Sequence, residues 1–140
     1  MMTLPSRRLA AACASLALMI AGLALTGCGS ASPSAPAPLV LLDTTVNLIE
    51  GAACNVGYVA AEFTGVAGQS VAVSVTGPTR LTPLVTLYAP DFATQLAGST
   101  SSGAGAAALT AALTQSGTHH LSICDLHGVA GALRVTVKQQ

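Results

Sequence analysis

Residues 70–76 read Ser-Val-Ala-Val-Ser-Val-Thr, in which every second position is a valine. Because successive side chains of a β-strand point to opposite faces, Val71, Val73 and Val75 share one face and predict a half-buried strand. Gly77-Pro78 follows at once and is typical of a strand end. The sequence period here is two, not the 3.6 of a helix.

The same period recurs along the chain, in short segments punctuated by Gly and Pro. Leu81 to Tyr88 is predicted to be a strand that closes at Ala89-Pro90-Asp91, and residues 104–113 are interpreted as a strand after a Ser/Gly-rich loop at residues 97–105. This spacing predicts an all-β, antiparallel β-sandwich over residues 43–140. The expected inward side chains are Val85 and Leu87 in one strand, His119, Leu121 and Ile123 in another, and Leu133, Val135 and Val137 after a turn at residues 128–131.

Composition narrows the function classes. The 140 residues are 51% hydrophobic, 7% charged and 3% aromatic, with formal net charge +0. This balance excludes a charge-rich disordered chain and a nucleic-acid binder that relies on a basic surface. The length allows one small domain with a modest core.

Residues 1–27 are predicted to be an export signal. Arg7 and Arg8 precede a run of uncharged residues from Leu9 to Leu25. The run ends in Leu25-Thr26-Gly27-Cys28, which resembles the bacterial lipobox, and that resemblance implies cleavage before Cys28 and attachment of lipid to its sulfur. The protein is then expected in the cell envelope, bound to the membrane through Cys28. An ordinary cleaved signal and a retained anchor are the alternatives.

Residues 28–42 are predicted to be the lipidated cysteine and a flexible tether. Residues 29–38 read Gly-Ser-Ala-Ser-Pro-Ser-Ala-Pro-Ala-Pro, which offers no bulky apolar side chain to bury. A Pro-rich ligand motif is the alternative interpretation. In lipoproteins of this kind an Asp after the anchor favours the inner membrane, so Gly29 favours the outer membrane if the host is Gram-negative.

Several fragments carry a family resemblance, which are Glu62-Phe63, residues 65–71, residues 81–88, Gln95-Leu96-Ala97, Ser116-Gly117-Thr118-His119 and residues 131–137. In this order they resemble the bacterial pre-peptidase C-terminal domain. The resemblance implies a jelly-roll-like sandwich over roughly residues 44–138. Three positions depart from the family pattern, with His119 at a usual Tyr, Phe92 at a frequent Gly and Ala132 at a common aromatic position.

Two cysteines, Cys54 and Cys124, remain after Cys13 leaves with the signal and Cys28 takes lipid. In an oxidising compartment the pair is most simply a disulfide. Two free buried thiols are an alternative, and a redox-active pair is disfavoured because no Cys-x-x-Cys motif is present.

The histidines do not predict a metal site. His119 and His120 are adjacent in a predicted strand, so they point to opposite faces and cannot chelate one ion. His120, Asp125 and His127 match no ligand spacing, and Asp43 and Glu50 are too sparse to suggest calcium. No metal or cofactor is therefore predicted.

Catalytic motifs are also missing from the sequence: it has no Gly-x-Ser-x-Gly elbow, no His-Glu-x-x-His and no phosphate loop. The favoured function is a non-catalytic, lipid-anchored binding or accessory module, with an envelope protein or a glycan as partner. Phe63 is expected in the core, so Tyr88 and Phe92, which flank the Ala89–Asp91 turn, are the candidate ligand platform. The alternatives are a structural surface lipoprotein without a ligand and a metal-carrying or redox lipoprotein.

Overall fold

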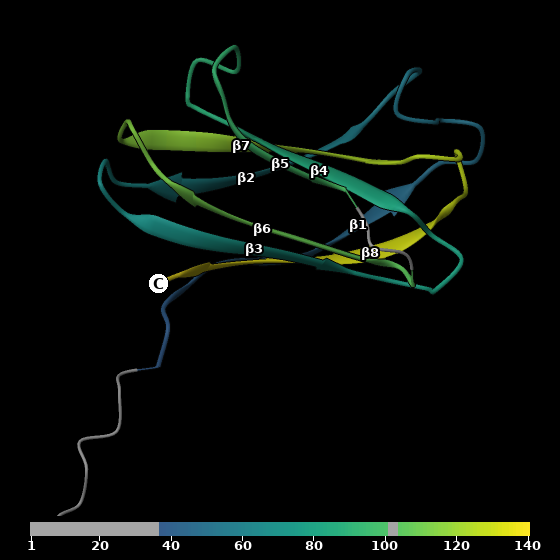
Figure 1. Ribbon diagram of the computed structural model, residues 1–140, viewed down its shortest axis with the longest axis horizontal. Coiled ribbons are helices and arrows are strands. Elements are labelled where there is room, and N and C mark those ends of the chain that lie inside the picture. The colour runs from purple at the N-terminus through teal and green to yellow at the C-terminus, as the bar shows by residue number, and fades with distance from the viewer. Residues whose placement is uncertain (1–36, 101–103) are drawn as a thin grey trace, which may run out of the picture. The chain divides into compact units, whose positions relative to one another are not determined.

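Two four-stranded antiparallel sheets pack face to face in the computed structural model, which describes residues 37–100 and 104–140 (Figure 1). The first sheet has the order β1-β8-β3-β6 and the second β2-β7-β4-β5. The predicted antiparallel β-sandwich is confirmed. The strands are β1 (Val40–Leu48), β2 (Val59–Gly65), β3 (Ser70–Thr76), β4 (Pro83–Tyr88), β5 (Gln95–Thr100), β6 (Ala106–Ala112), β7 (Gly117–Asp125) and β8 (Gly131–Gln139).

The core lies between the two sheets and follows the alternation of the sequence. Each strand turns every second side chain inward, so small aliphatic residues from both sheets meet in one layer. All the inward residues predicted for β3, β4, β7 and β8 are buried, as is Phe63 of β2. The fully buried side chains include Val71, Val75, Leu81, Leu87, Leu121, Ile123, Leu133, Val135 and Val137.

The expected loop at residues 97–105 is wrong in its first half. β5 begins at Gln95 and pairs with β4, where Leu87 lies opposite Ala97 and Thr86 opposite Gly98. Backbone groups make this pairing, so short side chains do not prevent it, and Leu96 and Ala97 pack against the core. The strand interpretation of the following Ala-rich segment is confirmed, because β6 pairs with β3 along its whole length.

The first strand also begins earlier than the predicted domain. β1 starts at Val40, three residues before Asp43, so the sandwich includes the last part of the predicted tether. Leu41 and Leu42 pack against the core, which explains why this apolar stretch joins the sheet. The predicted signal (1–27), Cys28 and the tether up to residue 36 lie outside the described residues.

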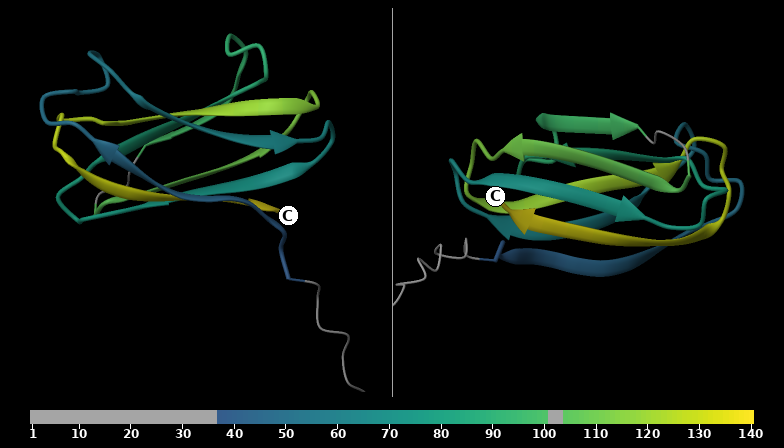
Figure 2. Two further views of the ribbon diagram at one scale, coloured as in Figure 1. Left: turned by 180° about the vertical axis from the view of Figure 1, so that it is seen from behind. Right: turned by 60° about the horizontal axis from the view of Figure 1, so that its bottom comes forward.

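The two ends of the described chain lie side by side (Figure 2). The Gln139 N–H donates to the Leu39 carbonyl at 2.8 Å, which places the start of β1 next to the end of β8. Within residues 37–100 and 104–140, no helix is long and apolar enough to cross a membrane.

Candidate ligand-binding face

Three aromatic side chains gather on the outer face of the β2-β7-β4-β5 sheet. The chain has only two Tyr and two Phe residues, so the fourth, Phe63, is the one in the core. Phe92 lies between the other two, with its ring centroid 5.4 Å from Tyr88 and 6.3 Å from Tyr58. Tyr58 is 55% exposed and Phe92 40%. We call Tyr58, Tyr88 and Phe92 the aromatic cluster.

The turn between β4 and β5 holds Phe92 in an unfavourable backbone conformation. Its φ of 56° is in the left-handed region, which costs a side-chain-bearing residue roughly 1–2 kcal/mol. The Asp91 carboxylate accepts bonds from the Thr94 hydroxyl at 2.6 Å, the Thr94 N–H at 2.8 Å and the Ala93 N–H at 3.0 Å. These bonds, the Thr94 hydroxyl first, lower the pKa of Asp91. The turn therefore places an exposed aromatic residue in a backbone conformation that costs energy.

His120 extends the cluster toward β2. Its ring meets Phe92 edge-on, with centroids 4.7 Å apart and planes at 81°. Its Nδ1 is 3.1 Å from Oε1 of Glu62, the residue opposite it on β2. The side chain of His120 is 18% exposed and that of Glu62 58%. His119 points into the core, so the predicted opposite orientation of the two histidines is confirmed.

One shallow hollow adjoins the aromatic cluster, and it forms, with a second hollow that shares two of its lining residues, what we call the groove. The two hollows have volumes of about 280 and 370 Å³ and share Leu84 and Thr86 of β4. We call the strand surface at the bottom of the groove its floor. It includes the short side chains of Thr86 and Ser122, and the aromatic rings lie beside it. The first hollow is also lined by Cys54, Tyr58, Tyr88, Phe92 and Cys124, and the second by Gln95, Gly98 and Ser99.

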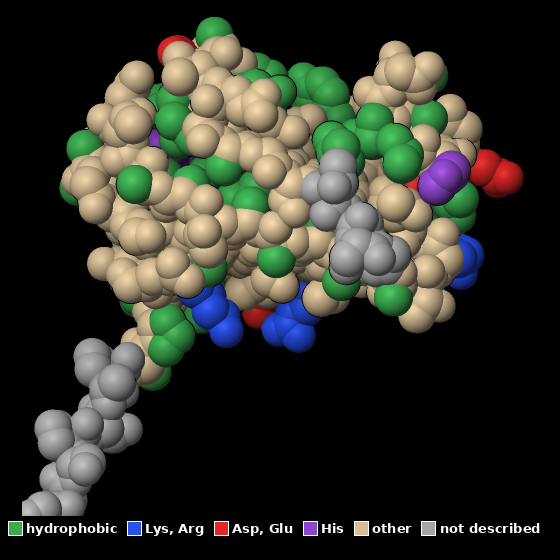
Figure 3. Space-filling model, viewed as in Figure 1, with side chains coloured by type: hydrophobic (Ala, Val, Ile, Leu, Met, Phe, Trp, Pro, Cys, Tyr) green, Lys and Arg blue, Asp and Glu red, His purple; other side chains and the backbone are tan. Residues whose placement is uncertain are grey.

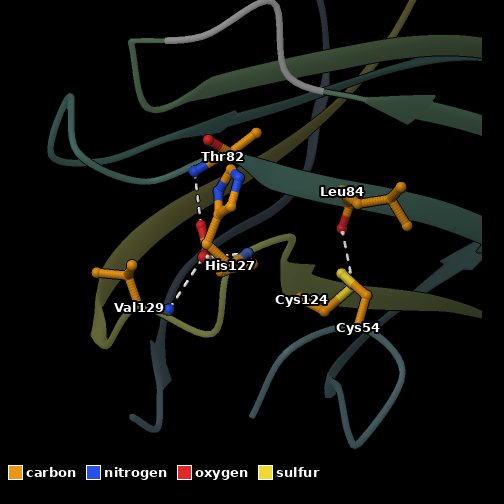
Figure 4. The surroundings of a disulfide bond; sticks show 7 residues. Cys54, Thr82, Leu84, Cys124, His127 and Val129 are labelled. Atoms are coloured by element: carbon orange, nitrogen blue, oxygen red, sulfur yellow. Dashed lines mark hydrogen bonds between the residues drawn. A yellow bond between two sulfur atoms is a disulfide. The ribbon is translucent and has the colours of Figure 1, made fainter. Parts of the chain in front are cut away.

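The predicted disulfide between Cys54 and Cys124 is confirmed. It fastens the loop between β1 and β2 to the end of β7, beside the Leu84 carbonyl of β4 (Figure 4). The same loop carries Tyr58 at its far end, immediately before β2. Sequence reasoning found the disulfide but missed Tyr58, although its closeness to Cys54 was a usable signal.

Asp125, next to the disulfide, is a structural residue. It is fully buried, and its carboxylate accepts N–H bonds from Thr82 at 2.5 Å and from His127 and Val129 at 2.9 Å each (Figure 4). Burial alone would raise the pKa of Asp125, but the three backbone N–H groups and the nearby His127 together lower it. The carboxylate thus joins the loop before β4 to the loop after β7.

Charged side chains are distributed unevenly between the two sheets. The basic residues of the described chain are Arg80 in a loop and Arg134 and Lys138 on β8. In Figure 3 basic side chains lie along the lower and right-hand edges, whereas the β2-β7-β4-β5 sheet is the upper layer of the same view. Within the described residues, that sheet has no Lys or Arg, and no group of three His, Cys, Asp or Glu residues is placed to hold a metal ion.

Comparison with known proteins supports the fold. No protein-family model matches the chain, and no curated protein matches its sequence. Among solved structures, the pre-peptidase C-terminal domain of a collagenase from Bacillus anthracis is similar, with a TM-score of 0.57 and 14% identity over 71% of this chain and 90% of that one. PliG of Aeromonas hydrophila, a periplasmic inhibitor of g-type lysozyme, gives 0.51 and 18% over 72% and 87%. At these identities the similarity establishes a shared sandwich fold.

Proposed function

We propose that the protein is a non-catalytic, lipid-anchored binding module of the cell envelope whose ligand occupies the outer face of the β2-β7-β4-β5 sheet. The observation that carries this proposal is the aromatic cluster. Three of the four Tyr and Phe residues are placed on one outer face, in a domain whose core is built almost entirely from Val, Leu and Ala. Aromatic side chains gathered on a surface are typical of binding sites.

The strained Phe92 turn gives a second, independent reason. A glycine would adopt the φ of 56° without cost, yet this turn has a large aromatic residue there. Strain of this kind is retained where a side chain has a function that depends on its position. The turn therefore supports a role for the Phe92 ring outside folding.

Support for the lipid anchor at Cys28 and for the cell-envelope location comes mainly from the sequence. The lipobox-like Leu25–Cys28 and the Pro-rich segment after it support attachment through Cys28, with a tether of ten residues that reaches about 30 Å when extended. The disulfide is consistent with an oxidising compartment. PliG is described as a periplasmic lysozyme inhibitor, so this sandwich fold serves as a non-catalytic binding protein in at least one envelope.

The test of ligand binding compares the native lipoprotein with a variant of the aromatic cluster. Both proteins are purified from membranes in mild detergent, immobilised and exposed to envelope extract. The variant carries Tyr58→Ala and Phe92→Gly, the latter chosen because glycine keeps the turn. Leu126→Ala, at an exposed residue outside the groove, is the control. Proteins or glycans retained by native protein and control but not by the variant support the proposal, and identical capture by all three contradicts it.

Lipid attachment has its own test. Cells that express the full chain are labelled with a radioactive fatty acid, beside cells that express Cys28→Ala. Label on the native chain and none on the variant supports the anchor. An unlabelled native chain released into the soluble fraction contradicts it.

A further inference from the structure

We propose that the ligand is an uncharged glycan whose sugar rings stack on Tyr58 and Phe92 and whose hydroxyl groups bond to the floor of the groove. This inference rests on the proposed function and specifies the chemistry of the same site. It draws on three separate properties of the face, which are its exposed rings, its polar floor and its charge.

The exposed rings provide the apolar half of the recognition. A pyranose presents C–H groups on its faces, which pack on aromatic rings, and hydroxyls on its edges. Tyr58 and Phe92 are the two exposed rings and are tilted by 35° to each other. Phe92 stacks on Tyr88 and meets the His120 ring edge-on, and these contacts restrict its ring before the ligand arrives.

The floor provides the polar half. Thr86 and Ser122 are direct neighbours on β4 and β7, and both side chains line the first hollow. A hydroxyl both donates and accepts a hydrogen bond, which suits a ligand that itself carries hydroxyls. Gln95 adds an amide in the second hollow, and Glu62 with His120 borders the cluster on the β2 side. A lipid chain would offer no hydrogen bond to the hydroxyls of Thr86 and Ser122 or to the Gln95 amide.

The charged side chains of this face determine which glycans it can bind. Glu62 and Asp91 are acidic, and the strands of this sheet carry no Lys or Arg in the described part of the chain. A uronate, sulfate or phosphate group would find no Lys or Arg on these strands and would be repelled by the two carboxylates. The face is therefore suited to uncharged sugars.

The length of the groove indicates an oligosaccharide. The two hollows share Leu84 and Thr86 of β4 as lining residues, so they are neighbours, one on the side of the disulfide and the other on the side of β5. Their volumes of about 280 and 370 Å³ each lie near the lower limit of roughly 300 Å³ for small-molecule sites. A chain of several sugars would occupy both.

The experiment measures binding of defined oligosaccharides to the lipidated protein in detergent by calorimetry. The ligands are tetramers of glucose and of N-acetylglucosamine, with a galacturonate tetramer as the anionic counterpart. The variants are Tyr58→Ala, Phe92→Gly and the control Leu126→Ala, and hydrogen exchange at β4 and β7 verifies that each remains folded.

The expected result is binding of at least one neutral tetramer that weakens about tenfold or more in each aromatic variant, as loss of a stacked ring predicts, and is unchanged in the control. The galacturonate tetramer should bind at least about tenfold more weakly. Equal binding by native protein and both aromatic variants overturns the inference, as does tighter binding of galacturonate.

Failure of the glycan inference can be separated from failure of the proposed function. If no neutral tetramer binds, but a protein captured from envelope extract is lost with the Tyr58→Ala/Phe92→Gly variant, the glycan is wrong and the binding face stands. If neither a glycan nor a captured protein depends on these residues, both proposals are wrong.

Discussion

The two sheets of the sandwich have similar inner faces and different outer faces. Both bury alternating Val and Leu side chains against each other. The outer face of β1-β8-β3-β6 carries Ser, Thr and Ala with the Asp43–Arg134 ion pair, and has no aromatic residue in its described strands. The outer face of β2-β7-β4-β5 carries the aromatic cluster, His120 and the groove.

This difference separates what the fold needs from what it permits. Burial imposes the inner pattern on both sheets, because a polar or missing side chain there costs stability directly. The outer faces are free of that constraint, so exposed aromatic rings gathered on one of them need another cause. Here the exposed rings and the strained Phe92 turn occur on the same sheet, which is why we propose the outer face of β2-β7-β4-β5 as the ligand-binding face, called the ligand face below.

The largest effect is expected from removing the disulfide, which attaches a loop to the second sheet only. The double variant Cys54→Ala/Cys124→Ala should lose about 4 kcal/mol of unfolding free energy, because the bond closes a separation of 70 residues in the unfolded chain. Urea unfolding measures the loss, and hydrogen exchange should show more opening at β2 and β7 than at β1 and β3. Equal opening of both sheets would show that the loop does not specifically support the ligand face.

Asp125 joins the loop before β4 to the loop after β7, and its replacement should have the next largest effect. Asp125→Ala leaves the N–H groups of Thr82, His127 and Val129 without their acceptor, at a cost of about 3 kcal/mol near neutral pH. Urea unfolding at pH 7 measures this cost, with Glu50→Ala as an exposed acidic control.

The pH dependence of this carboxylate has a definite sign. Because the pKa of Asp125 is lower folded than unfolded, its stabilisation is complete above the unfolded pKa of about 3.9 and is lost as the pH falls through the folded pKa. Native protein should therefore lose more stability between pH 5 and pH 2 than Asp125→Ala. Parallel pH profiles for the two proteins would contradict this role.

His119 lies on the inner face of β7, in the core between the two sheets, and its replacement should modestly raise the free energy of unfolding. The side chain is fully buried and stacked on Phe63 at 5.5 Å, Nδ1 is 3.1 Å from the Gly117 carbonyl oxygen, and Nε2 has no hydrogen-bond partner. His119→Phe removes that unpaired polar atom and should stabilise the protein by about 1 kcal/mol in urea unfolding. The same change at exposed His127 should not stabilise the protein, because it removes no buried unpaired atom and takes away a group that lowers the pKa of Asp125. Destabilisation by His119→Phe would mean that the Gly117 bond matters more than the unpaired nitrogen.

The sequence predicts the inner faces well because burial leaves a period of two in the residues themselves. Val71, Val73 and Val75 show it directly, and the sandwich follows from repeating it. The period of two does not reveal β5, because Gly98 and its Ser and Thr neighbours contribute backbone pairing rather than apolar side chains. The sequence does not predict Val40–Leu42 as strand because a boundary drawn from composition overlooks the first three residues of β1, of which Val40 and Leu42 pair with β8.

The ligand face is only partly predictable for a related reason. Tyr88 and Phe92 flank one turn, so the sequence places them together. Tyr58 and His120 join them only through the disulfide and the β2–β7 pairing, which bring distant positions side by side. The groove depends on where short side chains from three strands coincide, and no local pattern encodes that.

The smallest effect is expected on the outer face of the first sheet. Arg134 and Asp43 form two hydrogen bonds of 2.9 and 2.7 Å, and those bonds lower the pKa of Asp43. Both side chains are largely in solvent, where salt and side-chain entropy cancel most of the gain from such a pair. Arg134→Gln, alone or with Lys138→Gln, should leave urea unfolding, membrane attachment and ligand capture unchanged. If capture weakened with Arg134→Gln/Lys138→Gln and persisted with Tyr58→Ala/Phe92→Gly, the two sheets would exchange roles, and the ligand would be an anion held by β8.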